Sequence, residues 1–215
     1  MSDRPFLKDV EKLYGQVVVL NGASASFAPG RTHVLMGPSG AGKTTLLRLL
    51  AGLEEPDAGE VGRMGGARVA MTFQEDRLCD NLTVTANIRL PHGRLRGAER
   101  AAFLALEREA CAMVGLPCDE RPVRALSGGQ RRRVAILRCV LADADLLLFD
   151  EPLRGMDEGT VGDVMRYVMP RLDGRTVLWV THDDRELAFF SDPVCWCVEG
   201  GRVERRTAHR CPHVR

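Results

Sequence analysis

Short apolar runs separated by longer mixed stretches follow one another along most of the chain. The runs predict buried strands over residues 32–36, 68–73, 146–150, 177–180 and 194–198. The stretches between them predict helices over residues 46–52, 131–141, 158–172 and 185–190. Strands that alternate with helices in this way indicate an α/β fold.

The N-terminal part of the chain predicts a smaller, more irregular piece of sheet. Strands are predicted over residues 17–20 and 23–27, and Asn21-Gly22 between them is a strong signal for a two-residue hairpin turn. Residues 7–14 are amphipathic, and the glycines within residues 61–68 predict only short local pairing. A last hairpin turn is predicted at residues 199–202, which contain Gly200-Gly201.

The character of the chain changes between residues 80 and 126. Residues 81–90 predict a short helix closed by Pro91, and residues 98–114, rich in Ala, Leu, Glu and Arg, predict a longer one. We expect a helical insertion, about residues 80–130, within a single domain over residues 1–206. Residues 207–215 are expected to form a C-terminal tail.

Length and charge limit the classes of protein that fit. The chain has 215 residues, enough for one α/β domain with a substantial core. Its formal net charge of +1 gives no support for a nucleic-acid partner. No secretory leader follows residues 1–5, and no run approaches the roughly 18 apolar residues of a membrane span. We expect a soluble protein whose role at a membrane would need a partner.

The seven cysteines are scattered and odd in number, which is typical of a reduced, cytosolic protein. Cys195 and Cys197 could join His209, Cys211 and His213 in a metal site. The alternative is that Cys195 and Cys197 share one face of a strand and pack in the core, beside a frayed tail. The pattern favours this alternative.

The stretch from Gly37 to Thr45 has the spacing of a phosphate-binding P-loop, G-x-x-x-x-G-K-T, between a predicted strand and a predicted helix. Glycines allow several backbone N–H groups to point into one hollow, and the helix start adds the positive end of its dipole. Lys43 would contact the β- and γ-phosphates, and the Thr44 hydroxyl would bind Mg²⁺. The plainer interpretation is a glycine-rich turn that merely starts a helix.

Two later motifs complement this loop. The apolar run 146–150 ends in Asp150, which would help to hold Mg²⁺, and Glu151 follows as a candidate base for an attacking water. Residues 126–130 read Leu-Ser-Gly-Gly-Gln and form a second anion-binding nest at a helix start. Alone, the first motif could be a capped strand end, and the second an ordinary helix N-cap.

In this order, the P-loop, Gln74, the Leu-Ser-Gly-Gly-Gln pentapeptide, the acidic strand, Asp157 and His182 resemble the nucleotide-binding subunit of an ABC transporter. The similarity covers about residues 14–203. It implies a P-loop NTPase (RecA-like) core with an antiparallel β subdomain and a helical insertion that carries the signature motif. It also implies ATP and Mg²⁺ as cofactors and ATP hydrolysis as the activity.

The resemblance implies which residues contact the chain's own nucleotide. Tyr14 would stack on adenine, Glu151 would be the general base, and His182 would contact the γ-phosphate. Lys43 and Gln74 would also take part in catalysis, and Mg²⁺ would be held by Thr44, Gln74 and Asp150. The phosphates would lie against Gly37, Pro38, Ser39, Gly40, Ala41, Gly42, Lys43, Thr44 and Thr45. The alternatives are a packing aromatic for Tyr14, a polar strand end for Gln74 and a loop histidine for His182.

Other residues would act on the nucleotide of a second subunit in a head-to-tail dimer. Asp157 would lie at the dimer seam, or would simply cap the helix that starts at Glu158. Residues 152–156 depart from the family's usual run of small residues, and residues 61–68 are shorter and richer in glycine than usual. The signature residues acting in trans would be Ser127, Gly128, Gly129 and Gln130.

The expected partners are a second ATPase subunit, separate membrane permease subunits and a solute-binding protein, with no nucleic acid. The protein would then be peripheral on the cytoplasmic face of the cell membrane, with residues 74–78 as the docking surface. The stretch 73–78 resembles the ATPases of nitrate, sulfonate and taurine importers. An efflux or lipid-extraction ATPase, or a soluble ABC ATPase outside transport, are the alternatives.

Overall fold

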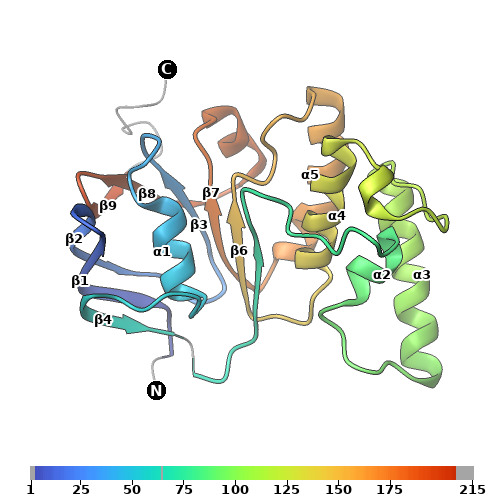
Figure 1. The fold of residues 1–215 in the computed structure, drawn as a ribbon, viewed down its shortest axis with the longest axis horizontal. Helices are drawn as coiled ribbons and strands as arrows, with labels where there is room; N and C mark the ends of the chain where they lie inside the picture. The colour runs from blue at the N-terminus through green and yellow to red at the C-terminus, as the bar shows by residue number, and fades with distance from the viewer. Residues whose placement is uncertain (1–2, 64, 207–215) are drawn as a thin grey trace. The chain divides into compact units, whose positions relative to one another are not determined.

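The computed structural model describes residues 3–63 and 65–206, which form two compact units (Figure 1). The first unit comprises Met1–Met71, Ala144–Glu151 and Leu172–Arg215, and the second comprises Thr72–Asp143 and Pro152–Arg171. The second unit includes the residues of the predicted insertion together with residues 72–79, 131–143 and 152–171. The predicted tail and its His209, Cys211 and His213 lie outside the described residues.

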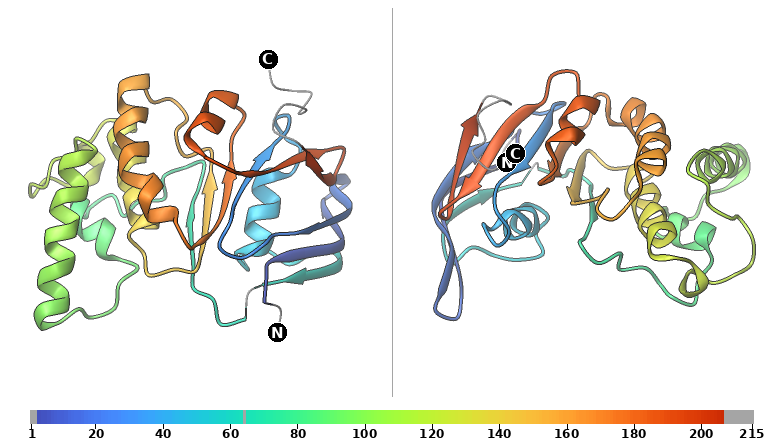
Figure 2. Two further views of the ribbon diagram at one scale, coloured as in Figure 1. Left: turned by 180° about the vertical axis from the view of Figure 1, so that it is seen from behind. Right: turned by 90° about the horizontal axis from the view of Figure 1, so that it is seen from above.

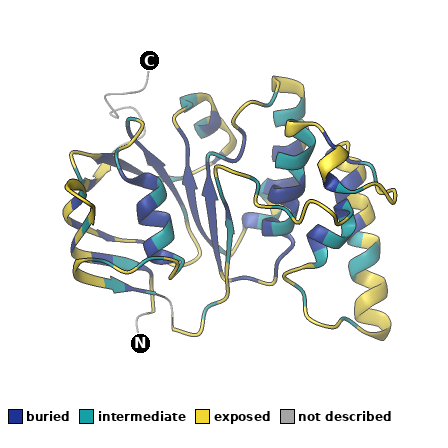
Figure 3. Cartoon of the chain, viewed as in Figure 1, coloured by how far each residue is buried: buried dark blue, intermediate teal, exposed yellow. Residues whose placement is uncertain are grey.

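A six-stranded sheet runs through the first unit. Strand β3 pairs in parallel with β7 and β8, β6 pairs in parallel with β7, and β9 closes the edge as an antiparallel hairpin with β8. All residues of β6 and β7 are buried (Figure 3), because helices or loops cover both faces of a parallel sheet. In spatial order the strands are β5 (Val69–Thr72), β6 (Leu146–Asp150), β7 (Thr176–Val180), β3 (Thr32–Met36), β8 (Val194–Glu199) and β9 (Arg202–Arg206).

A three-stranded antiparallel sheet in the same unit has the order β2 (Val17–Ser26), β1 (Phe6–Tyr14) and β4 (Ala58–Gly62). Helix α1 (Lys43–Leu50) follows β3 and is labelled in Figure 1. Figure 2 shows it from two further sides, and its leucines belong to a core shared with both sheets. Cys195 and Cys197 are buried on β8, so the prediction that they pack in the core is confirmed.

The predicted hairpin turn at Asn21-Gly22 is wrong. Strand β2 continues through these residues, and the turn from β1 lies at Gly15, which has φ 60°. Val10 pairs with Ala23 and Lys12 with Leu20, so Asn21 and Gly22 together face the single residue Glu11. The positive φ of 66° at Gly22 therefore serves a β-bulge rather than a turn.

The second unit contains α2 (Val84–Arg89), α3 (Gly97–Met113), a 3₁₀ turn over Val123–Ala125, α4 (Gly128–Val140) and most of α5 (Glu158–Leu172). The Asn87 side chain, fully buried in α2, accepts from the Cys79 N–H and donates to the Cys79 and Thr83 carbonyls. Glu107 of α3, also buried, accepts from Arg89 of α2 at 3.0 Å. The predicted helices are confirmed, and the short one near residue 185 is a 3₁₀ helix over Asp184–Phe189.

Candidate nucleotide-binding site

The loop between β3 and α1 has a backbone that only glycine fits at its first position. Gly37 has φ 146°, and a Cβ there would lie 2.1 Å from the Val198 carbonyl oxygen of β8. Gly40 and Gly42 also have positive φ, of 78° and 99°, and Gly42 precedes α1 without any side-chain cap. The first N–H groups of α1 are thus not occupied by a capping side chain, which is the arrangement that favours an anion.

Lys43 lies within this loop rather than in solvent. Its side chain is buried, and its ammonium donates to the carbonyls of Gly37 and Pro38, each at 2.8 Å. A charged amine held by neutral carbonyls in a glycine loop is poised to attract an anion, because its charge is not neutralised by these contacts.

Thr44 and Asp150 meet although 106 residues separate them in the chain. The Thr44 hydroxyl donates to the Asp150 carboxylate at 2.9 Å, since β6 delivers Asp150 beside the start of α1. Burial raises the pKa of Asp150, the neighbouring Glu151 raises it further, and the bond from Thr44 opposes the shift. A buried carboxylate beside a hydroxyl is an oxygen donor set that suits Mg²⁺.

Glu151 and His182 form a second pair at the same ends of β6 and β7. The Glu151 carboxylate lies 3.3 Å from His182 Nδ1, and its backbone N–H donates to the Val180 carbonyl at 3.1 Å. Glu151 has φ 46°, a conformation that side chains other than glycine rarely adopt and that occurs in strained functional sites. The Glu151 side chain is 12% exposed and that of His182 60%, so the pair opens toward solvent on the histidine side.

The loop after β7 is held by a residue that the sequence analysis did not single out. Glu186 is buried and accepts a hydrogen bond from Trp179 Nε1 at 2.7 Å, and burial raises the pKa of this carboxyl. The Thr181 hydroxyl accepts from the Asp183 N–H at 3.0 Å. These bonds fix both sides of His182. The available signal was Glu186 beside the apolar residues Leu187–Phe189 of the same short helix.

Tyr14 lies at the end of β1 with a half-exposed ring. Its hydroxyl donates to the Glu54 carboxylate, which also accepts from Arg48 of α1 at 3.2 Å. Burial and the bond to Glu54 raise the pKa of the Tyr14 phenol. The structure thus ties Tyr14 to α1 and leaves the ring accessible.

Gln74 and the signature residues belong to the second unit. Ser127 caps α4: its hydroxyl accepts from the Gln130 N–H at 3.3 Å, and the Gln130 side chain accepts from the Ser127 N–H at 3.0 Å. A Cβ on Gly128 or Gly129 would meet no atom within 4 Å, so their backbone is open to a partner. The N-cap interpretation of the pentapeptide is therefore correct, and it leaves these glycines available.

Asp157 is placed as a helix cap as well. Its carboxylate accepts from the Thr160 N–H at 2.9 Å and from the Thr160 hydroxyl at 2.7 Å, and these bonds lower its pKa.

The side chain of Gln74 is exposed. The structure brings together Lys43, Thr44, Asp150, Glu151 and His182 within the first unit.

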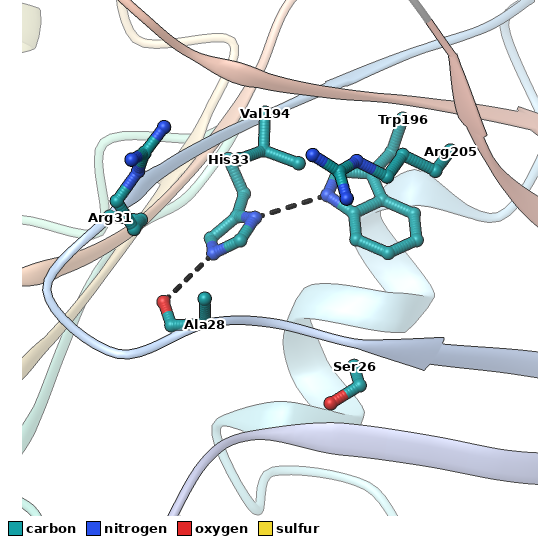
Figure 4. Close-up of a pocket in the computed structure, with 7 residues that line it drawn as sticks. All are labelled: Ser26, Ala28, Arg31, His33, Val194, Trp196 and Arg205. Atoms are coloured by element: carbon teal, nitrogen blue, oxygen red, sulfur yellow. Dashed lines mark hydrogen bonds between the residues drawn. The ribbon is translucent and has the colours of Figure 1, made fainter.

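A separate cavity of about 250 Å³ lies at the N-terminal end of β3, away from the P-loop that follows its C-terminal end (Figure 4). Its buried His33 accepts from Trp196 Nε1 at 3.1 Å and donates to the Ala28 carbonyl at 3.0 Å, as Figure 4 shows. Burial lowers the pKa of His33, and Arg31 and Arg205 lower it further. His33 is thus a neutral, fully bonded core histidine with no part in the nucleotide site.

The fold and the loop geometry define a P-loop nucleotide-binding protein: a buried strand, a glycine loop around a buried lysine, a helix, and a carboxylate bonded to the loop's threonine. The family model for the ABC transporter matches residues 20–154. The chain belongs to this family, as its ATP-binding cassette.

Three relatives of this chain are import ATP-binding proteins. The chain is 39% identical to the aliphatic sulfonates import ATP-binding protein of Nocardia farcinica, over all of this chain and 87% of that protein. It is also 39% identical to a sulfate/thiosulfate import ATP-binding protein of Chromobacterium violaceum, over 89% of this chain and 55% of that protein. An sn-glycerol-3-phosphate import ATP-binding protein of Rhizobium johnstonii is 39% identical over 92% of this chain and 60% of its own length. This chain thus spans little more than half of two of these three relatives.

Solved structures show the same fold. A dimeric ATP-binding cassette in a post-hydrolysis state with ADP and Pi has a TM-score of 0.81 and 27% identity, over 96% of this chain and all of that chain. The expected P-loop NTPase fold and the expected family are therefore confirmed.

Within the described ranges, no helix has the length and apolar character required to cross a bilayer.

Proposed function

We propose that this chain binds Mg²⁺-ATP and hydrolyses it as the nucleotide-binding subunit of a bacterial ABC importer. The observation that carries the proposal is the convergence of Lys43, Thr44 and Asp150 beside the Glu151–His182 pair. The import names of the relatives support import over efflux. The separate membrane subunits, the solute-binding protein and the location at the cytoplasmic face of the membrane belong to this proposal.

Each group of the site has a role in the proposed reaction. Lys43 would contact the β- and γ-phosphates in place of its two carbonyls, and the N–H groups at the start of α1 would hold the phosphate oxygens. Thr44, Asp150 and Gln74 would hold Mg²⁺, which when bound offsets charge on the β- and γ-phosphates. Tyr14 offers its exposed ring to the adenine.

The chemical step would be in-line attack of water on the γ-phosphorus, in which the new P–O bond forms while the bond to the β–γ bridging oxygen breaks and ADP leaves. Glu151 orients that water and accepts its proton, while His182 donates a hydrogen bond to the γ-phosphate as charge develops. The 3.3 Å contact between the two side chains supports this pairing, since it keeps the carboxylate and the imidazole on the same side of the site.

A second copy of the chain completes the proposed site. Ser127, with the open glycines Gly128 and Gly129 and with Gln130, would face the γ-phosphate held by the partner, and Asp157 would lie at the seam. A single cassette is then expected to bind ATP but to hydrolyse it poorly. The related cassette structures, which are dimeric, support this arrangement.

The test is Glu151→Gln. The variant should bind ATP, lose turnover by about 100-fold or more, and elute as a dimer from a sizing column in ATP. Glu151→Gln combined with Lys43→Ala is the matched control and should stay monomeric. A Glu151→Gln protein that hydrolyses ATP at the wild-type rate would remove Glu151 as the base, and one that never dimerises would refute the shared site.

A further inference from the structure

Three arginines of α4 hold the segment that carries Gln74. We define residues 73–80 as the Gln74 strap; they follow β5 and lead toward α2. We propose that Arg132 is a positioning residue for Gln74, and that through this residue Gln74 and the signature motif move together. This inference rests on the proposed function, in which Gln74 contacts Mg²⁺ or the attacking water.

Arg132 bonds the backbone carbonyls that precede and follow the Cα of Gln74. Its Nη1 donates to the Phe73 carbonyl at 2.7 Å and its Nη2 donates to the Gln74 carbonyl. Its Nε lies 3.1 Å from the Asp76 carboxylate, and the Arg132 side chain is only 14% exposed. A planar guanidinium that spans two carbonyls and a carboxylate fixes direction as well as distance, which a single bond does not.

The neighbouring arginines extend the attachment along the strap. Arg138, almost two turns further along α4, donates to the Asp76 carbonyl at 3.2 Å and to the Arg77 carbonyl at 3.0 Å. Arg131 donates to the Asp80 carboxylate at 2.8 Å. The strap is therefore bonded to α4 at its start, middle and end.

The strap itself has a bent conformation that these bonds maintain. Arg77 has φ 43°, and its guanidinium lies 4.1 Å from the centre of the Phe73 ring. A non-glycine residue in this region is disfavoured unless its surroundings hold it. The Arg138 bonds on either side of this residue provide that restraint, so the position of Gln74 depends on α4.

Helix α4 begins with the signature motif, since Ser127 is its N-cap and Gln130 lies in its first turn. Arg131 and Arg132 come directly after Gln130 in the chain. In the proposed dimer, Gln74 serves the chain's own nucleotide while Ser127 serves the partner's. A shift of α4 caused at one nucleotide is thus transmitted to the other through Arg132.

The test is a double-mutant cycle on the full chain, with steady-state ATP hydrolysis as the readout. Arg132→Ala should lower kcat about 10-fold and leave the KM for ATP within about twofold, because the P-loop contacts are untouched. In a Gln74→Ala background, Arg132→Ala should cost less than about twofold more, since a residue that acts through Gln74 has nothing left to position. If Arg132→Ala lowers kcat by the same factor in the Gln74→Ala background as in wild type, the proposal is overturned.

Two further variants separate positioning from folding. Arg132→Lys keeps the charge beside Asp76 but cannot span two carbonyls, so it should also lower kcat and should increase amide exchange in the strap. Arg166→Ala, an exposed residue of α5 paired with Asp163, should match wild type. Wild-type kcat in Arg132→Lys would overturn the inference alone, whereas a wild-type chain without ATPase activity would overturn the proposed function.

Discussion

Asp150 offers a test in which the buried carboxylate of the site is expected to weaken the fold in the absence of ligand. Its side chain is 1% exposed, and burial is the main cause that raises its pKa above the ordinary value. Asp150→Asn removes the charge, keeps the shape and keeps an oxygen that accepts from the Thr44 hydroxyl. The variant should therefore be more stable than wild type without nucleotide at neutral pH.

The magnitude follows from two opposing contributions. Desolvation of an ionised carboxylate costs several kcal/mol even after partial compensation. The bond from Thr44 loses about 1 kcal/mol when its acceptor becomes neutral. We expect a net gain of about 1–3 kcal/mol in the free energy of unfolding, or roughly 5 °C in Tm.

The dependence on pH identifies the cause. Because the folded-state pKa of Asp150 is raised, the unfolded chain loses this proton first as the pH increases above about 4. The folded state then binds more protons than the unfolded state, so wild-type stability falls until the pH passes the folded-state pKa. The amide introduced by Asp150→Asn does not titrate, so the advantage of the variant should grow between pH 4 and neutral pH.

The assay is denaturant unfolding of both proteins at several pH values, without nucleotide and with Mg²⁺-ATP. At a hundredfold excess over Kd, ligand should stabilise wild type by about 2.7 kcal/mol and the variant by less, so the stability advantage of the variant should shrink. A variant that is less stable at neutral pH without nucleotide, or an advantage that does not change with pH, would refute the reasoning.

Two further predictions concern packing. Gly40→Ala should cost about 1–2 kcal/mol for its positive φ alone, whereas Gly37→Ala should cost about 1–3 kcal/mol more because its Cβ meets the Val198 carbonyl. Equal losses in denaturant unfolding would contradict this. Glu107→Ala should lower the free energy of unfolding by about 1–3 kcal/mol, since Arg89 is left partly buried without this carboxylate. Asp163→Ala, a control at an exposed ion pair, should change it by no more than about 0.5 kcal/mol in the same assay.

The elements around the P-loop could be predicted because their causes are local. The short β-branched and apolar stretch Thr32–Met36 between polar segments favours a buried strand, and the spacing of Gly37, Gly42 and Lys43 specifies the loop that follows it. The pentapeptide at residues 126–130 likewise starts a helix through bonds between Ser127 and Gln130, three residues apart.

Asn21-Gly22 shows where local preference fails. The pair favours a hairpin turn, but the strand pairs with β1 on both sides of it, and the Asn21 N–H donates to the Gly201 carbonyl at 2.9 Å. Gly201 lies near the other end of the chain, so no local pattern could predict this bond. Long-range pairing outweighs the intrinsic turn preference, and the glycine becomes a bulge.

The sequence alone determined which chemical groups the chain has and the family to which it belongs, because spacing within a motif is a local property. Only the tertiary structure decided which groups meet: Thr44 with Asp150, Glu151 with His182, and Arg132 with the Gln74 carbonyl. The first two meetings depend on strand order, which places the ends of β6 and β7 together and β6 near α1. The third depends on how α4 packs along the strap, which is set by contacts between residues about 60 positions apart.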